Sequence, residues 1–307
     1  MPGLDSFRYF LVLFSLVLFL VSKSSDAERP FHCEGAHPAD GLLYQNPDLF
    51  HDFYVFKCVT TVLFTSGDRG RTTGNFSYML ERGLEDAYSY MAGTAPDETA
   101  WDETHVQFNG KVILFRSLKD VPQVQILYLR LPSGTADGSG YAANDGESLK
   151  RLYDGDIKSL TAIDGSSTYT LESLQDLLGA ILKKRAACDI RVLDFKTPLP
   201  GKNNDGSDHA DHSVSAKVVV DVWKREQLGG NLRGYAANFM RRLSPTLNVS
   251  TMDYRVKLNV FLQYAAQDKD MCKDYDNCFE VERSGGPYLD EDFKFVPTWM
   301  EREYYVS

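Results

Sequence analysis

Two short stretches of this 307-residue chain hold side chains that could bind a metal ion. His37 and Asp40 stand three residues apart around Pro38, on a loop that is expected to follow a strand. They offer one nitrogen and one oxygen ligand. Far downstream, residues 208–212 read Asp-His-Ala-Asp-His. Ligation by His37, Asp40 and His212 would leave a fourth position open for water, which is the arrangement that catalytic zinc requires.

In this order, the two stretches resemble the signature of the LmbE-like superfamily, which includes the GlcNAc-phosphatidylinositol de-N-acetylases and the mycothiol-pathway deacetylases. That family carries A-H-P-D-D after its first strand and H-P-D-H or D-H-x-D-H late in the chain. The resemblance covers about residues 31–270 and continues between the motifs in these stretches: Asn46-Pro47-Asp48-Leu49, Thr65-Ser66-Gly67-Asp68, Glu85-Asp86-Ala87-Tyr88, Met91-Ala92-Gly93 and Asp194-Phe195.

The resemblance implies a zinc-dependent N-deacetylase that hydrolyses the acetamide of an N-acetylglucosamine-containing substrate, such as an N-acetylated sugar or glycolipid. The implied zinc ligands are His37, Asp40 and His212. His209 would stabilise the oxyanion or protonate the departing amine. Asp208 or Asp211 would orient a histidine ring from behind, as carboxylates near metal sites commonly do.

One position departs from the family pattern. The first Asp of A-H-P-D-D is the family's general base, and Ala39 occupies that position here. Loss of a positioned base costs about 10² to 10⁴ in rate. Replacement of the base by Asp68, Glu34 or Asp211 from another direction stays open. Two functions therefore remain, a weakened deacetylase and a secreted, non-catalytic relative that binds a glycan through the retained metal pocket.

The elements that must position these residues alternate between β-rich runs and helical stripes. Strands are expected at residues 31–36, 54–64, 124–131 and 190–195. Each polar motif follows a strand, which favours an α/β fold. The fold class implied with the resemblance is a doubly wound, mostly parallel sheet with helices on both faces, in a single domain over residues 28–307 with its core at about 31–270.

Local signals add four expectations. Thr170 should cap a helix, Gly93 should end another, and Asn109-Gly110 should turn a hairpin. A helix should begin near His212. Past residue 268 the sequence shows no pattern that places the tail.

Three further residues are candidates for substrate contact. Asp68 lies in a loop at the end of a strand, where it could line the pocket or fix the turn. Residues 132–146 form a long polar stretch that is either a substrate-covering loop or a surface insert. If it covers the site, Asp137 and Tyr141 are its expected sugar contacts.

The N-terminus contains an apolar run over residues 9–21, flanked by Arg8 and Lys23. The run is shorter than the about 20 residues of a membrane span. It has the length of a signal-peptide core, with a cleavage site after Ala27. We expect a secreted protein with residues 1–27 removed; the alternative is an anchor in the endoplasmic reticulum membrane, and membrane association is expected only if this segment is retained. Sequons at Asn75 and Asn248 fit the secretory route of a glycoprotein.

Composition narrows the partners. A hydrophobic fraction of 43% is sufficient for a large core, and the net charge of −10 argues against a nucleic-acid partner. Of the five cysteines, Cys272 and Cys278 flank a short polar loop and could form a disulfide in an oxidising compartment. The sequence leaves the oligomeric state open.

Overall fold

The computed structural model describes residues 30–32, 36–71, 75–200, 208–284 and 296–306. The predicted signal segment, residues 1–27, lies outside these ranges, as does Glu34. No helix among the described residues is both long and apolar enough to cross a membrane.

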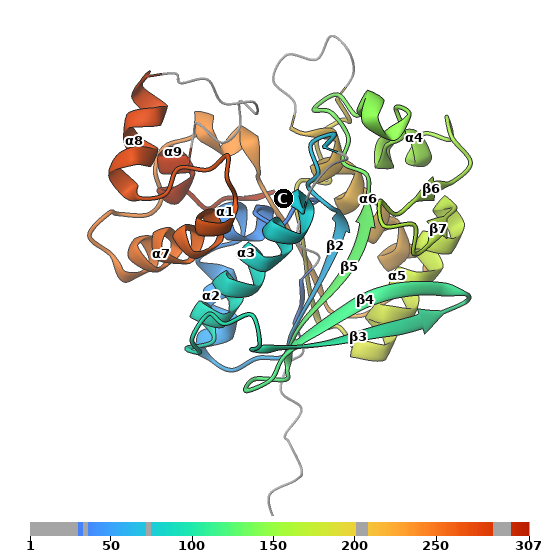
Figure 1. Cartoon of the computed structure of the whole chain (residues 1–307), viewed down its shortest axis with the longest axis horizontal. Helices are drawn as coiled ribbons and strands as arrows, with labels where there is room; N and C mark the ends of the chain where they lie inside the picture. The colour runs from blue at the N-terminus through green and yellow to red at the C-terminus, as the bar shows by residue number, and fades with distance from the viewer. Residues whose placement is uncertain (1–29, 33–35, 72–74, 201–207, 285–295, 307) are drawn as a thin grey trace, which may run out of the picture.

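The protein is α/β, with one large sheet between two groups of helices (Figure 1). The strands are β1 Pro30–His32, β2 Val59–Thr65, β3 Trp101–Phe108, β4 Lys111–Leu118, β5 Val124–Leu131, β6 Leu160–Thr161, β7 Thr168–Tyr169, β8 Asp189–Val192, β9 Asn231–Tyr235 and β10 Tyr305–Val306. The α-helices are α1 Asp40–Tyr44, α2 Asp48–Tyr54, α3 Phe76–Met91, α4 Leu149–Tyr153, α5 Leu171–Arg185, α6 Ala210–Arg225, α7 Met252–Gln267, α8 Tyr275–Ser284 and α9 Val296–Met300. Two 3₁₀ turns span Ala142–Asn144 and Asn238–Arg242.

The large sheet has eight strands in the order β10-β9-β8-β1-β2-β5-β4-β3. The neighbours from β9 to β5 pair in parallel, and the outer strands pair antiparallel. From β1 the chain proceeds to β2 and β5 on one side, whereas from β8 it proceeds to β9 on the other. The strand order therefore reverses between β1 and β8, and the carboxyl ends of strands at such a point leave a crevice where ligands bind.

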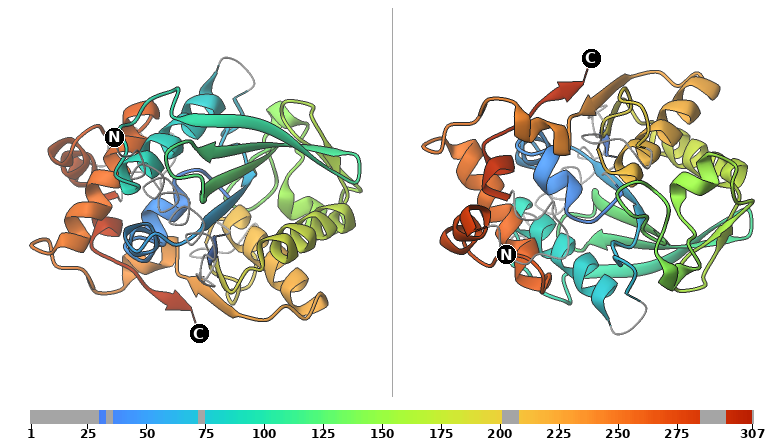
Figure 2. Two further views of the ribbon diagram at one scale, coloured as in Figure 1. Left: turned by 90° about the horizontal axis from the view of Figure 1, so that it is seen from below. Right: turned by 90° about the horizontal axis from the view of Figure 1, so that it is seen from above.

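Both faces of the central strands are buried. In β5, Val124, Ile126 and Tyr128 belong to one core cluster, and Leu127, Leu129 and Leu131 belong to the other. Helices α1, α2, α3, α7 and α9 pack on the first face, and α4, α5 and α6 pack on the second. Figure 2, which views the molecule from below and above, shows the same two groups of helices on either side of the sheet.

Several local expectations are confirmed. The side chain of Thr170 accepts a hydrogen bond from the Ser173 amide at the start of α5. Asn109 and Gly110 both have positive φ, 45° and 77°, which suits the two-residue turn between β3 and β4. Gly93 follows α3 with φ 73°. Cys272 and Cys278 form a disulfide.

Other boundaries were wrong. The expected strand at 54–64 begins only at Val59, because Tyr54 is the last residue of α2 and Phe56 has a left-handed conformation. The strand expected at 190–195 is Asp189–Val192. Of the strand expected at 31–36, the described part is Pro30–His32; residues 33–35 lie outside the described ranges.

The tail that the sequence could not place belongs to the same structure. Trp299 of α9 is fully buried and packs edge-on against Tyr44, with ring centroids 5.5 Å apart. The last described strand, β10, pairs antiparallel with β9. The core therefore extends beyond the predicted limit near residue 270.

Candidate metal centre

The topology explains how two distant motifs meet. His37 and Asp40 follow β1, and the residues from Asp208 to His212 lead into α6 after the neighbouring strand β8. The first loop is tied to the end of β2, since the amide and hydroxyl of Thr65 donate to the Ala36 carbonyl at 3.0 and 2.6 Å.

The first motif is closed by its own hydrogen bonds. The His37 amide donates to Asp40 Oδ2 at 2.8 Å, and the Asp40 amide donates to the His37 carbonyl at 3.1 Å. This tight turn places both side chains on the same side of the loop, and Asp40 then opens α1.

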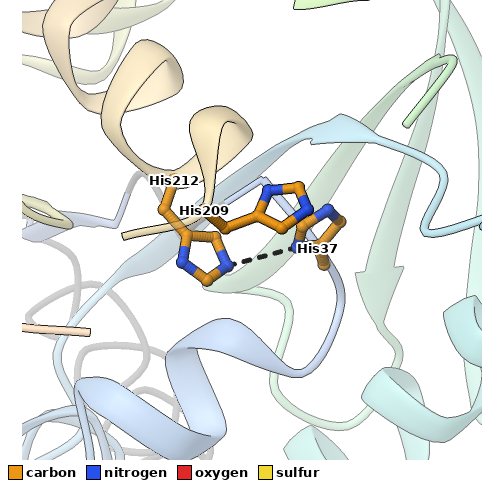
Figure 3. A group of neighbouring side chains, drawn as sticks. All are labelled: His37, His209 and His212. Atoms are coloured by element: carbon orange, nitrogen blue, oxygen red, sulfur yellow. Dashed lines mark hydrogen bonds between the residues drawn. The ribbon is translucent and has the colours of Figure 1, made fainter. Parts of the chain in front are cut away.

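His37, His209 and His212 form a group that could hold a metal ion (Figure 3). Each histidine contributes one ring nitrogen to this group, and these three nitrogens lie within 4.8 Å of one another. His37 Nδ1 is 3.3 Å from His212 Nε2. The structure therefore brings the two predicted motifs together.

Asp40 completes a tighter set with two of these rings. Asp40 Oδ1 is 3.2 Å from His212 Nε2, and Asp40 Oδ2 is 3.5 Å from His37 Nδ1. Ring nitrogens and carboxylate oxygens repel one another through their lone pairs at such distances unless a proton or a metal cation lies between them. Protons or a metal ion must occupy this space.

A carboxylate stands behind each of the two rings. Asp208 Oδ1 is 2.9 Å from His212 Nδ1, and Asp211 Oδ2 is 3.3 Å from His37 Nε2. In each ring the nitrogen that contacts the carboxylate is the one that faces away from the cluster. Such a contact fixes the tautomer and leaves the other nitrogen as a possible ligand. The sequence suggested that one of these two carboxylates would lie behind a ring, and the structure has both in place.

Both of these carboxylates also bind backbone amides. Asp208 Oδ1 accepts the His209 amide at 2.8 Å and lies 3.4 Å from the Asn238 amide. Asp211 Oδ2 accepts the Gly134 amide at 2.7 Å. The predicted long loop at 132–146 therefore reaches the site through its backbone.

His209 is held differently from the other two histidines. It is the N-cap of α6, and its Nδ1 accepts the Asp211 amide at 3.2 Å. A neutral ring that accepts at Nδ1 carries its proton on Nε2. His209 lines the same cavity as His37 and His212, so it can donate a hydrogen bond into that cavity.

Electrostatics in the cluster favour ion pairs. Burial alone would lower the pKa of His37, but Asp40 and Asp211 outweigh it and raise this pKa from 6.5 to about 9. Despite burial, the neighbouring His212 and His37 hold the pKa of Asp40 well below its usual range. Burial likewise opposes protonation of His212, yet Asp40 and Asp208 raise its pKa well above the ordinary value. In the absence of a metal, the protonated rings of His37 and His212 therefore balance the negative charge of the carboxylates.

The cavity above the cluster is small and walled by both halves of the chain. Its described lining residues are His37, Pro38, Ala39, Asp40, Leu43, Tyr44, Gly67, Arg69, Leu80, Ser133, Gly134, Tyr141, His209, His212 and Tyr264. Among these residues Asp40 supplies the one carboxylate. Ala39 is 2% exposed and lines this cavity.

The residues that were considered as replacement bases are engaged elsewhere. Asp68 accepts four hydrogen bonds, from Ser66 Oγ, the Ser133 amide, the Gly70 amide and Asn144 Nδ2, at 2.8 to 3.0 Å. Asp211 is fully buried behind His37. Of the two alternatives for Asp68, its contacts agree with fixing the loop.

Of the two remaining candidates for substrate contact, Tyr141 lies at the cavity and Asp137 does not line it. The Tyr141 side chain also packs closely against Gly70, on the side where a Cβ would otherwise project. Asp137 is not among the described lining residues; its Oδ1 accepts hydrogen bonds from Thr135 Oγ1 and from the amide and hydroxyl of Ser139.

A buried ion pair in the cavity wall was not predicted from the sequence. Arg69 lines the cavity and pairs with Asp268 at 2.9 Å, and Tyr264 donates to the same carboxylate at 3.2 Å. The partners are 199 residues apart, so spacing could not have predicted their contact.

No family model matches the chain, and no curated protein matches it. Among solved structures, the chain is similar to a conserved protein from Thermus thermophilus, with 15% identity and a TM-score of 0.42 over 86% of this chain and 91% of the other.

Proposed function

We propose that this chain has the doubly wound LmbE-type fold and a zinc site of the GlcNAc-phosphatidylinositol de-N-acetylase type. Its substrate class would be an N-acetylated sugar or glycolipid whose acetamide enters the cavity over the histidine cluster. The same proposal makes His37, Asp40 and His212 the zinc ligands.

One observation supports this ligand set above all others. His212 Nε2 lies 3.2 Å from Asp40 Oδ1 and 3.3 Å from His37 Nδ1, and the other carboxylate oxygen, Asp40 Oδ2, lies 3.5 Å from His37 Nδ1. Tetrahedral zinc with bonds of about 2.0–2.1 Å has edges of about 3.3 Å between its ligands. The three residues could therefore hold one zinc ion beside the cavity that they line. The wider spread of the three-histidine group, up to 4.8 Å, makes His209 a weaker ligand candidate than Asp40.

The residues of the chain have distinct tasks in such a site. Asp208 and Asp211 hold the two ligand rings from behind, so that binding requires little reorganisation. His209, with its proton on Nε2, can donate a hydrogen bond to the amide oxygen as negative charge develops there, or protonate the departing amine. Zinc, when bound, lowers the pKa of water and polarises the amide carbonyl.

The cavity has no carboxylate at position 39 to accept the proton of the attacking water. Without a positioned base the rate should fall by about 10² to 10⁴ relative to a complete site. We therefore propose slow hydrolysis. Ala39 also favours a second candidate function, a non-catalytic protein that binds a glycan through the same metal pocket.

Two features of the chain bear on the cellular location of the protein. Asn75 and Asn248, the two sequon residues, are exposed. The Cys272–Cys278 disulfide suits an oxidising compartment. A secreted protein is the proposed state, with retention at the endoplasmic reticulum membrane as the alternative.

Metal analysis combined with an amine-release assay tests this proposal. Wild type should bind about one zinc and release amine slowly from N-acetylglucosamine derivatives, whereas His212→Ala should do neither. His105→Ala is the matched control, because His105 is exposed on β3. Zinc and sugar binding without any amine release would favour the second candidate, and absence of zinc from wild type would reject both.

A further inference from the structure

The end of α2 exposes three consecutive large apolar side chains. Tyr54, Val55 and Phe56 have exposed fractions of 71%, 57% and 76%. Scattered apolar residues are normal on a protein surface, but a contiguous group at a protruding helix end commonly marks a contact site.

Phe56 occupies a backbone position that does not suit it. Its φ is 58°, in the left-handed region, and it directly follows the C-cap of α2. The Lys57 amide donates to the Asp52 carbonyl at 3.0 Å, which closes the helix in the way that glycine normally permits. A bulky residue is strained there and gains no burial in return. Folding therefore does not explain a phenylalanine at this position.

A fourth exposed apolar residue lies at the start of α7. Met252 begins α7 and is 70% exposed. Its neighbour Asp253 is 3.0 Å from His51 Nε2, one turn before Tyr54 on α2. Because this contact brings the start of α7 beside α2, we include Met252 with Tyr54, Val55 and Phe56 in what we call the apolar tip.

The register of the sheet locates the tip relative to the N-terminal segment. Phe31 of β1 lies opposite Thr60 of β2 in parallel pairing, so β1 and β2 start at the same edge as the end of α2. That edge is at the lower end of the sheet in Figure 1. The apolar run at residues 9–21 ends nine residues before β1 begins at Pro30. If the run is retained as an anchor, it would hold the chain to a bilayer from this edge of the sheet.

The metal centre lies at the opposite, carboxyl edge of the same strands. A bilayer contact at the apolar tip would therefore leave the cavity open to solvent.

Charges beside the tip are balanced. A pocket next to Val55 contains three basic groups, each paired with a carboxylate: Lys57 with Asp52, Arg191 with Asp189 and Asp52, and Arg233 with Asp48. The whole chain has a net charge of −10. Attraction to anionic lipid cannot supply the binding energy, so apolar insertion must do so.

We propose that the apolar tip inserts into the interfacial region of a lipid bilayer and seats this edge of the protein on the membrane. Tyrosine is enriched at the headgroup boundary, and phenylalanine inserts at the boundary with the acyl chains. The tip comprises four side chains, whereas a stable protein interface has roughly 20–30 residues on each side, which disfavours a second protein as the occupant.

Site-specific quenching tests the proposal with the full chain. Phe56→Trp and the control Ile163→Trp are mixed with phosphatidylcholine vesicles that contain brominated lipid, and the signal of the native tryptophans is subtracted. Ile163 is a suitable control because it is 42% exposed and distant from the tip, where its amide donates to the Arg130 carbonyl near the carboxyl end of β5. Bromine quenches only on close contact, so this readout reports the tip separately from any insertion of residues 9–21.

We expect at least twofold stronger quenching at position 56 than at position 163, and no further gain when phosphatidylserine is added. Equal quenching at the two positions would overturn the proposal. A dimer in lipid-free buffer that Phe56→Gly dissociates would also overturn it, because the tip would then bind a second copy. Phe56→Gly should fold with an unchanged or raised Tm, since glycine accepts the positive φ.

Discussion

His37 Nδ1 and His212 Nε2 lie 3.3 Å apart although 175 residues separate them in the chain. Each ring is held from behind by a different carboxylate, Asp211 for His37 and Asp208 for His212. The paired histidines are thus fixed on both sides, and the space between them is shared with Asp40. In the zinc site that we propose, Asp208 and Asp211 would therefore raise the affinity without contacting the metal.

The first prediction concerns the carboxylate behind His212. Asp208→Asn keeps the shape of the side chain but removes the charge that makes the ring a better ligand. Zinc affinity should fall by about 10- to 100-fold. Competition with a chelator measures the change, and Asp221→Asn, which alters a hydrogen bond from Tyr153 on the same helix α6, is the control. Equal affinities for the two variants would contradict the role given to Asp208.

The second prediction concerns pH. In the metal-free protein the pKa of His37 is about 9, so at pH 7 a proton occupies a ring that must be neutral to bind metal. Zinc must displace this proton below pH 9. Affinity should therefore rise with pH by about tenfold per unit for each proton displaced, and continue to rise above 6.5, the ordinary histidine value. Calorimetry in buffers of different ionisation enthalpy would count the protons released. An affinity that levels off at pH 6.5 would contradict the assignment.

The third prediction concerns Gly134. A Cβ at this position would lie 2.8 Å from Asp211 Oδ1 and 3.4 Å from the Ser148 Cβ, in a fully buried environment. Gly134→Ala should displace the carboxylate that holds His37 and destabilise the fold by about 1–3 kcal/mol. Zinc affinity should fall with it. Gly229→Ala is the control, because a Cβ there meets nothing within 4 Å. Thermal unfolding with and without zinc separates the two effects, and a Gly134→Ala protein with wild-type Tm and affinity would refute this packing argument.

The sequence was most informative where local chemistry decides the structure. Turn residues such as Asn109-Gly110 and the cap at Thr170 act through neighbours a few positions away, so their structures could be predicted. The pairing of His37 with His212 came from the order of two motifs, and it needed β1 and β8 to be adjacent strands.

The features that could not be predicted depend on contacts between distant residues. Burial of Trp299 against Tyr44 and the pairing of Arg69 with Asp268 have no local signature. The error at Tyr54–Phe56 has a different cause. Tyrosine, valine and phenylalanine favour strands, but here they end a helix with their side chains in solvent. Local propensity failed at the position that we infer to contact a membrane.

The most direct test of the central account is the rate of amide hydrolysis by Ala39→Asp. Ala39 lies between the ligand residues His37 and Asp40 in the motif and faces the cavity, so a carboxylate at this position could accept a proton from water in the cavity. Amine release from an N-acetylglucosamine derivative is compared for wild type and variant at equal bound zinc. We expect nearly unchanged zinc affinity and a rate increase of about 10²-fold or more. A variant that binds zinc as wild type does but hydrolyses no faster would contradict the claim that this site lacks only one carboxylate.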